Sequence, residues 1–146
     1  MNITLIVRYI HFISILIVFA TLVFEYLMLA NQLDRKTIGK ISRVDGIYGV
    51  FAIVIVGAGL TLWLWVGKPA EFYNANGIIY IKLGLFSLVG ILSIWPTIFF
   101  LKQRKGDENE MVEIPPLIKK LVLAEIILML LIPALAVMMA NGVNLF

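Results

Sequence analysis

Four apolar stretches occupy most of the 146-residue chain, and each is long enough to cross a lipid bilayer. A helix needs about 20 consecutive apolar residues to span about 30 Å of hydrocarbon. We therefore predict helices over the ranges Leu5–Leu29, Asp45–Val66, Ile78–Leu101 and Leu117–Ala140. Because the connections are short, neighbouring helices should run antiparallel. The expected fold class is all-α, a polytopic membrane protein whose up-down four-helix transmembrane bundle forms a single domain over residues 1–146.

Composition excludes several other classes of protein. With 62% hydrophobic and 14% charged residues, the chain has too little polar surface to enclose a soluble core. It contains no cysteine and one histidine, which excludes disulfides, iron–sulfur clusters and multi-histidine metal sites. The net charge of +3 does not indicate nucleic-acid binding, because the basic residues lie in short loops beside the spans. The expected partner is the lipid bilayer.

The basic residues also predict an orientation. The first and third connections and their borders hold nine of them: Arg35, Lys36, Lys40, Arg43, Lys102, Arg104, Lys105, Lys119 and Lys120. The second connection holds only Lys68. Basic loops are retained in the cytoplasm. Both termini should therefore lie outside it, and the first connection, residues 31–44, should extend the first helix or lie on the membrane surface.

Ionisable residues within the spans fall into two layers. Arg8, His11 and Lys82 lie one to two turns from the outer ends of their helices. The inner layer is anionic, with hydroxyl groups at similar depth on the third helix, and comprises Glu25, Asp45, Ser93, Thr97 and Glu125. Ionisable side chains inside a membrane are costly and usually face the bundle interior. These two layers therefore hold the candidate functional residues.

Each layer allows more than one interpretation. His11 could ligate haem iron, relay protons or only bond a neighbouring helix, while Arg8 and Lys82 could neutralise haem propionates or extend outward to lipid phosphates. Glu125, two turns inside its helix, should be protonated, paired or in a hydrated cavity, with Lys40, Arg43, Ser93 and Thr97 as expected partners. Asp45 could be only the cap of the second helix.

Small residues recur at helical spacing. They are Gly46, Gly49 and Gly57 on the second helix and Gly84, Ser87, Gly90 and Ser93 on the third. Small residues let membrane helices approach closely, so we expect these two faces to pack inside the bundle.

Several short motifs are spread along the chain: Arg8-Tyr-Ile-His11-Phe, Val44-Asp45-Gly-Ile-Tyr48-Gly49, Lys82-Leu-Gly-Leu-Phe and Leu92-Ser93-Ile-Trp-Pro96-Thr97. On these motifs the chain resembles, nearly end to end, the bacterial membrane family of domain of unknown function 2214. The resemblance implies a bacterial inner (cytoplasmic) membrane protein and assigns no reaction.

A few positions are also similar to the HemJ-type protoporphyrinogen oxidases and the copper-resistance D membrane proteins. The similarity rests on His11 in the first helix and Lys82 early in the third. In the HemJ-type enzymes the histidine of the first helix is associated with haem b. The resemblance therefore implies His11 as a ligand of haem iron and Lys82 as a partner residue.

Three hypotheses of function follow. The first is a haem-binding or redox-active membrane protein, with His11, Arg8 and Lys82 at the cofactor. The second is a small proton-coupled transporter that uses the intramembrane carboxylates. The third is an accessory subunit, or a homo-oligomer, whose small-residue faces bind other membrane helices.

Overall fold

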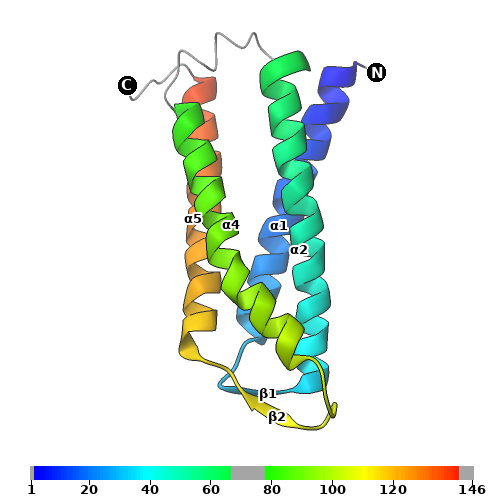
Figure 1. Cartoon of the computed structure of the whole chain (residues 1–146). Helices are drawn as coiled ribbons and strands as arrows, with labels where there is room; N and C mark the ends of the chain where they lie inside the picture. Colours follow the sequence, from blue (N-terminus) through cyan, green and yellow to red (C-terminus); the bar gives the residue numbers. More distant parts are fainter. Residues whose placement is uncertain (1, 67–77, 142–146) are drawn as a thin grey trace.

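The computed structural model describes residues 2–66 and 78–141 (Figure 1). In this part of the chain four long helices run side by side: α1 (Ile3–Met28), α2 (Arg35–Thr61), α4 (Ile78–Gln103) and α5 (Pro116–Ala140). A π-helical turn, η1 (Leu62–Val66), continues α2. Two short strands, β1 (Gln32–Asp34) and β2 (Met111–Glu113), lie at one end of the bundle. The second predicted connection, with Lys68, lies outside the described residues.

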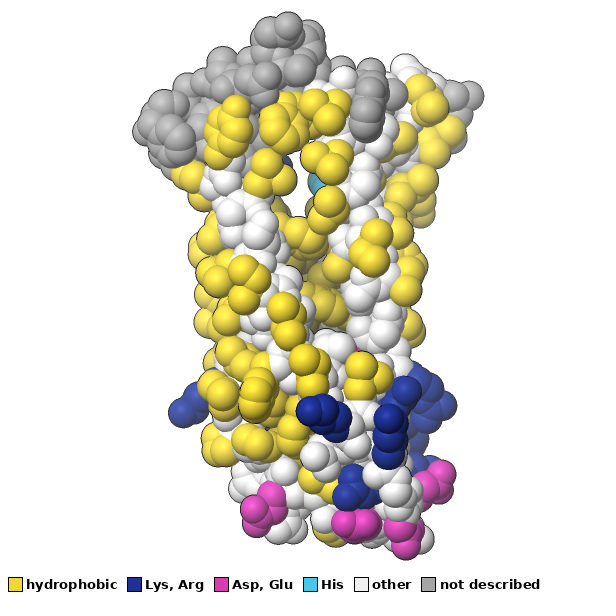
Figure 2. All heavy atoms as spheres, viewed as in Figure 1, with side chains coloured by type: hydrophobic (Ala, Val, Ile, Leu, Met, Phe, Trp, Pro, Cys, Tyr) yellow, Lys and Arg dark blue, Asp and Glu magenta, His cyan; other side chains and the backbone are white. Residues whose placement is uncertain are grey.

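The predicted antiparallel bundle of four membrane-length helices is confirmed. α1 packs mainly against α2 and α4 against α5, while α1 also contacts α5 and α2 contacts α4. By length and composition, each of the four described helices is able to cross a membrane. Their apolar side chains cover the flanks of the molecule, and Lys, Arg, Asp and Glu gather at the end that carries β1 and β2 (Figure 2). We call this end the basic end.

The start of the second helix was predicted wrongly. Asp45 was expected at or near its beginning, but α2 begins at Arg35, so the segment 35–44 neither extends α1 nor forms a separate surface element. Asp34 is the residue that caps α2, since its side chain accepts a hydrogen bond of 2.8 Å from the backbone N–H of Thr37. Asp45 is therefore an interior residue of α2, about 15 Å along the helix axis from Arg35.

A small sheet that the sequence did not reveal ties the first and third connections together. β1 pairs with β2 in antiparallel register, with Leu33 opposite Val112. Beside it, the Arg35 guanidinium donates to the carbonyl oxygen of Gln103 at 2.6 Å and to Glu110 Oε1 at 3.0 Å. Arg35 therefore fixes the start of α2 against the end of α4 and the segment before β2.

The core follows one face of each helix. On α1 the buried residues recur every three or four positions, the spacing of one helical face, and are Ser14, Val18, Thr21, Leu22 and Glu25. They pack with a cluster of apolar side chains from the other helices that includes Ile41, Phe100, Ile118 and Val122. Polar groups on this inward face therefore meet at the centre of the bundle.

The expected close packing of small residues is wrong. A Cβ atom added to Gly46, Gly49, Gly57, Gly84 or Gly90 would meet nothing within 4 Å. These faces are open in the isolated chain rather than packed within the bundle. The helical glycine that does make a close approach is Gly59, whose added Cβ would lie 3.2 Å from Cε1 of His11.

Candidate functional site

Three carboxyl side chains meet inside the bundle near its basic end. Glu25 comes from α1, Asp45 from α2 and Glu125 from α5, and they are 1%, 7% and 1% exposed, respectively. We call these three residues the acidic cluster. Glu25 is three residues from the end of α1, whereas Asp45 is ten residues from the start of α2. The helices therefore extend by different lengths beyond the level at which the carboxyl groups meet. All three lie within the candidate membrane spans.

The members of the acidic cluster are close enough to interact. The Glu25 carboxyl lies near those of Asp45 and Glu125, and Asp45 in turn lies near Glu125. Two carboxyl groups in contact bond favourably only when they share a proton, because an ionised carboxylate has no hydrogen to donate. The arrangement therefore puts neighbouring carboxyl groups where a proton could be shared between them.

Hydroxyl groups from two helices stabilise two of the three members. The Tyr48 hydroxyl donates to Glu125 Oε1 at 3.1 Å, and the Thr97 hydroxyl donates to Asp45 Oδ2 at 2.5 Å. By contrast, Oε1 of Glu25 is buried and has no hydrogen-bond partner among the described residues. A buried oxygen without a partner costs about 1–3 kcal/mol. Glu25 is therefore the member of the cluster whose hydrogen bonding is incomplete.

A cavity whose lining includes several hydroxyl-bearing residues adjoins the acidic cluster between α2 and α4. Its volume is about 230 Å³, and its lining consists of Ser42, Asp45, Gly46, Tyr48, Gly49, Ser93, Thr97 and Leu101. The cavity therefore reaches the cluster through Asp45. At the same place, the Arg104 guanidinium donates to the Ser42 hydroxyl at 3.3 Å, so a fixed positive charge borders the cavity. Carboxyl and hydroxyl groups lining one cavity can bind water, a proton or a small polar solute.

The structure brings together most of the predicted inner layer. Glu25, Asp45, Glu125 and Thr97 meet as described, and the hydroxyl of Ser93 lines the same cavity while donating to the carbonyl oxygen of Gly90 at 2.6 Å. The expectation that Asp45 caps α2 is wrong, because that role belongs to Asp34.

A hydroxyl group was among the expected partners of Glu125, but the residue that supplies it, Tyr48, was not predicted. Lys40 and Arg43, two of its expected partners, are exposed, and the Arg43 guanidinium donates to the carbonyl oxygen of Gly39. Sequence reasoning missed Tyr48 in this role. Tyr48 follows Asp45 by three positions within a motif singled out in the sequence, and that spacing places both side chains on one helical face.

The outer layer assembles in part. His11 and Lys82 are half-buried, and Lys82 is close enough to the imidazole to act on it electrostatically, whereas Arg8 is exposed. The imidazole lies against α2, where the carbonyl oxygen of Ile55 is nearby. That approach does not complete a hydrogen bond, because Nδ1 is buried without a partner in the described part of the chain.

A hollow opens beside His11. Figure 2 shows an opening between the α1–α2 pair and the α4–α5 pair, with the imidazole, coloured cyan, visible inside it. Within residues 2–66 and 78–141, no group of three or more His, Asp or Glu side chains is arranged to hold a metal ion.

Comparison with known proteins identifies a family. The family described as "Predicted membrane protein (DUF2214)" matches residues 3–144, nearly the whole chain. No curated protein and no solved structure matches the chain. The resemblance drawn from the sequence motifs is confirmed for this family, and its description names a membrane protein without assigning a reaction.

Proposed function

The chain belongs to the DUF2214 family of predicted membrane proteins, and on that premise we propose that it is a small proton-coupled membrane transporter. The acidic cluster is its proton-binding site. One observation carries the proposal: three buried carboxyl groups from three helices meet beside a cavity that Asp45 and four hydroxyl-bearing residues help to line, and Oε1 of Glu25 has no partner in the described residues.

The incomplete bonding of the cluster favours function over scaffolding. A polar network kept only for stability satisfies all of its members, because a half-satisfied buried network is less stable than an apolar core. Here Glu125 and Asp45 each accept a hydroxyl hydrogen bond, while one oxygen of Glu25 accepts none. A buried carboxyl oxygen without a hydrogen-bond partner supports a site whose proton moves between neighbouring carboxyl groups.

The cavity supports a route for the proton and its solute. It borders Asp45 and contains the hydroxyl groups of Ser42, Tyr48, Ser93 and Thr97. Hydroxyl groups both donate and accept hydrogen bonds, so they can pass a proton along or coordinate a small polar solute. The positive charge of its loops favours a cytoplasmic position for the basic end, and on that orientation the proton would be exchanged with the cytoplasm there.

Proton flux into proteoliposomes tests the proposal. Vesicles that trap a pH-sensitive dye receive the full chain, and a potassium diffusion potential drives proton entry. We expect flux above that of empty vesicles, reduced at least about tenfold in Glu25→Gln and in Glu125→Gln. Glu113→Gln is the matched control, because Glu113 is exposed on β2 outside the acidic cluster. Flux equal to that of empty vesicles, or flux unchanged in both cluster variants, would contradict the proposal.

A haem at His11 is the second candidate function. It is favoured by the buried, unpartnered Nδ1 and by the nearness of Lys82. His11 would hold the haem iron and Lys82 would offer a positive charge to a propionate, and haem b would supply electron transfer. The exposed Arg8 does not join this set. The purified protein would then show a Soret band that is lost in His11→Ala and kept in Arg8→Gln, and no band after expression with added haem rules this candidate out.

The open glycine faces favour membrane partners. Space at Gly57, Gly84 and Gly90 leaves room for another helix, either from a different subunit or from a second copy of the chain. Co-purification at a fixed stoichiometry from an inner membrane would support an accessory role, and a monomer that alone conducts protons would exclude it.

A further inference from the structure

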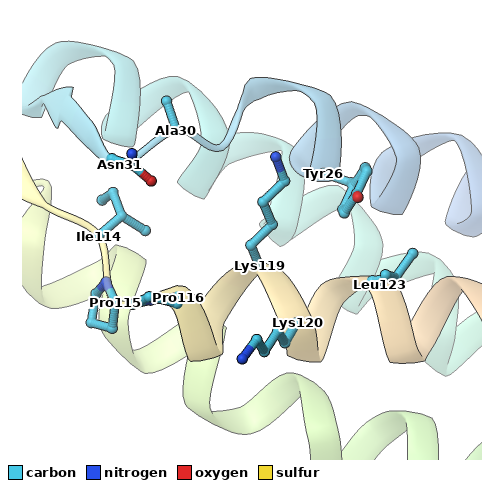
Figure 3. Close-up of a pocket in the computed structure, with 9 residues that line it drawn as sticks. All are labelled: Tyr26, Ala30, Asn31, Ile114, Pro115, Pro116, Lys119, Lys120 and Leu123. Atoms are coloured by element: carbon cyan, nitrogen blue, oxygen red, sulfur yellow. The ribbon is translucent and has the colours of Figure 1, made fainter.

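A second cavity lies on the opposite side of the basic end, between the end of α1 and the start of α5. Its volume is about 250 Å³, and it is lined by Tyr26, Ala30, Asn31, Ile114, Pro115, Pro116, Lys119, Lys120 and Leu123. Figure 3 shows Lys119 extending from α5 across to α1, beside Tyr26. We call this cavity the lysine pocket. It shares no residue with the cavity beside the acidic cluster.

The charged residues that line the lysine pocket are all positive. Two of its nine lining residues are lysines and none is acidic. Lys119 Nζ lies 4.9 Å from the centre of the Tyr26 ring, and within the described chain neither lysine forms an ion pair. Figure 3 shows Lys119 extending toward α1 and Lys120 extending from the other side of α5, so Lys119 is the nearer donor and Lys120 adds positive charge at the edge of the pocket. With the Asn31 amide as a further donor, these groups match the chemistry of a phosphate group.

The position of the pocket is that of a lipid headgroup. The span in α5 begins at Pro116, so Lys119 and Lys120 stand within about its first turn and a half. Tyr26 lies at the same end of the bundle, two residues before α1 ends at Met28. Tyrosine and lysine at this depth characterise the boundary between hydrocarbon and headgroups.

Apolar surface continues from the pocket along α5. Leu123 lines the pocket, and Ile127 and Leu130 follow it at helical spacing, with exposed fractions of 39%, 51% and 59%. Residues four and then three positions apart share a face, so these side chains form one stripe running into the membrane. A free phosphate ion would make no use of such a stripe, whereas an acyl chain would lie along it.

We propose that the lysine pocket binds the phosphate of an anionic phospholipid, with Lys119, Lys120 and Asn31 at the headgroup and an acyl chain along Leu123, Ile127 and Leu130. The volume of about 250 Å³ lies below the roughly 300–1,000 Å³ of sites for drug-sized ligands, which suits a phosphate and its ester atoms. This site is independent of the proton-binding role proposed for the acidic cluster.

Lipid titration of the full chain in detergent tests the site. The probes are short-chain phosphatidylglycerol, short-chain phosphatidylcholine and inorganic phosphate, with binding read by native mass spectrometry. The pocket variant is Lys119→Gln with Lys120→Gln. The matched control is Lys102→Gln with Lys105→Gln, which removes the same charge from exposed positions at the same end. We expect phosphatidylglycerol to bind better than phosphatidylcholine and to lose about tenfold or more in affinity in the pocket variant alone.

Three outcomes would overturn the proposal. Equal losses in the pocket and control variants would show general attraction to a basic surface. Equal binding of the two lipids would remove the role of charge. Inorganic phosphate that displaces phosphatidylglycerol at equal concentration would assign the pocket to the free ion. If the pocket variant fails to fold, Lys119→Arg with Lys120→Arg keeps the charge and should retain binding, and its loss would contradict the proposal.

Discussion

At the scale of single residues, the molecule is organised by polar side chains on inward helical faces. The inward faces of α1, α2 and α5 bring Glu25, Asp45 and Glu125 together. Hydroxyl groups on α2 and α4 donate to Glu125 and Asp45, respectively. The same inward face of α1 holds His11 against Gly59 of α2, about four helical turns away from Glu25. Glycine is required at that contact because a side chain would press on the imidazole.

Replacing Gly59 tests this contact. In Gly59→Ala the new Cβ would lie 3.2 Å from Cε1 of His11, so the ring must move, whereas Gly57→Ala adds a methyl group to open space. Alanine is favoured over glycine in a helix by about 1 kcal/mol, and overpacking costs about 1–3 kcal/mol. We expect Gly57→Ala to be the more stable variant by about 1 kcal/mol or more in thermal unfolding, with the imidazole NMR signals shifted only in Gly59→Ala. Equal stability and unshifted signals would contradict the contact.

At the scale of elements, the basic end is held by the β1–β2 pair and by Arg35. Gly106, in the turn after α4, has a φ of 124°, which side chains rarely adopt, and an added Cβ would lie 2.9 Å from Nε of Arg35. Arg35 has little freedom to yield, because its guanidinium is bonded to Gln103 and Glu110. The turn thus depends on glycine for both its backbone and its space.

Gly106→Ala should therefore loosen the basic end. We expect a loss of about 1–3 kcal/mol in the free energy of unfolding, because the backbone strain and the displaced Arg35 act together. Faster proteolysis within residues 104–110 should accompany it. Gly39→Ala is the control, since its Cβ would meet nothing within 4 Å. If both variants unfold and are cleaved alike, Arg35 and Gly106 do not fix this end.

The cap of α2 makes a prediction about pH. The hydroxyl and backbone N–H of Thr37 donate to Asp34 and lower its pKa below the usual 3.8, with Lys36 and Lys40 adding to the effect. A carboxyl group whose pKa falls on folding stabilises the protein above its unfolded pKa, and that contribution is lost as the pH drops through the folded pKa. Asp34→Asn keeps a capping side chain and removes the titration.

The melting temperature of the wild-type chain should therefore fall more steeply below about pH 4 than that of Asp34→Asn. The acidic cluster is the same in both proteins, so the difference between their pH profiles isolates the cap. Parallel profiles would mean that the charge of Asp34 does not stabilise the start of α2.

Sequence reasoning succeeded for elements that a single physical rule determines. Hydrocarbon thickness dictates the length of a spanning helix, and α1, α4 and α5 begin and end within two residues of their predicted limits. The start of α2 was missed because basic residues were read as a loop, although Asp34 and Thr37 supply a cap there. The β1–β2 pair joins segments about 80 residues apart, and no local pattern in either three-residue strand indicates its partner.

The sequence predicted the depth of the candidate site residues in the membrane and the helical faces that carry them, but not which side chains contact one another. Helical spacing placed Glu25, Asp45 and Glu125 at one level, and they do meet. Which hydroxyl groups they bond depends on how α2 and α4 are rotated against each other. A single sequence does not fix that rotation, so Tyr48 was missed and Arg8 was grouped with His11 and Lys82, although it is exposed.

At the scale of the whole molecule, charge and apolar surface are separated along the bundle axis. The flanks are apolar, and charged side chains gather at the basic end (Figure 2). That separation predicts the orientation, with the basic end in the cytoplasm and the N-terminus outside. In that predicted orientation, the acidic cluster and the lysine pocket would lie in the cytoplasmic half of the membrane.

Cysteine labelling tests the orientation directly, because the chain has no cysteine of its own. Asn2 and Asn109 are exposed at opposite ends of the bundle and serve as single-cysteine positions. In intact spheroplasts, a maleimide that does not cross membranes should label Asn2→Cys, and it should label Asn109→Cys only after permeabilisation. The reverse labelling pattern would show the opposite orientation, with the acidic cluster in the outer half of the membrane.

Infrared spectroscopy of the protein in lipid tests whether the acidic cluster holds a shared proton. It reads the carbonyl stretch of protonated carboxyl groups while the pH is changed. If the acidic cluster holds a shared proton, the wild-type chain shows this band near neutral pH, and the band weakens in Glu25→Gln and persists in Glu113→Gln. Absence of the band across the neutral range, or a band that none of the substitutions at Glu25, Asp45 or Glu125 alters, would contradict the account.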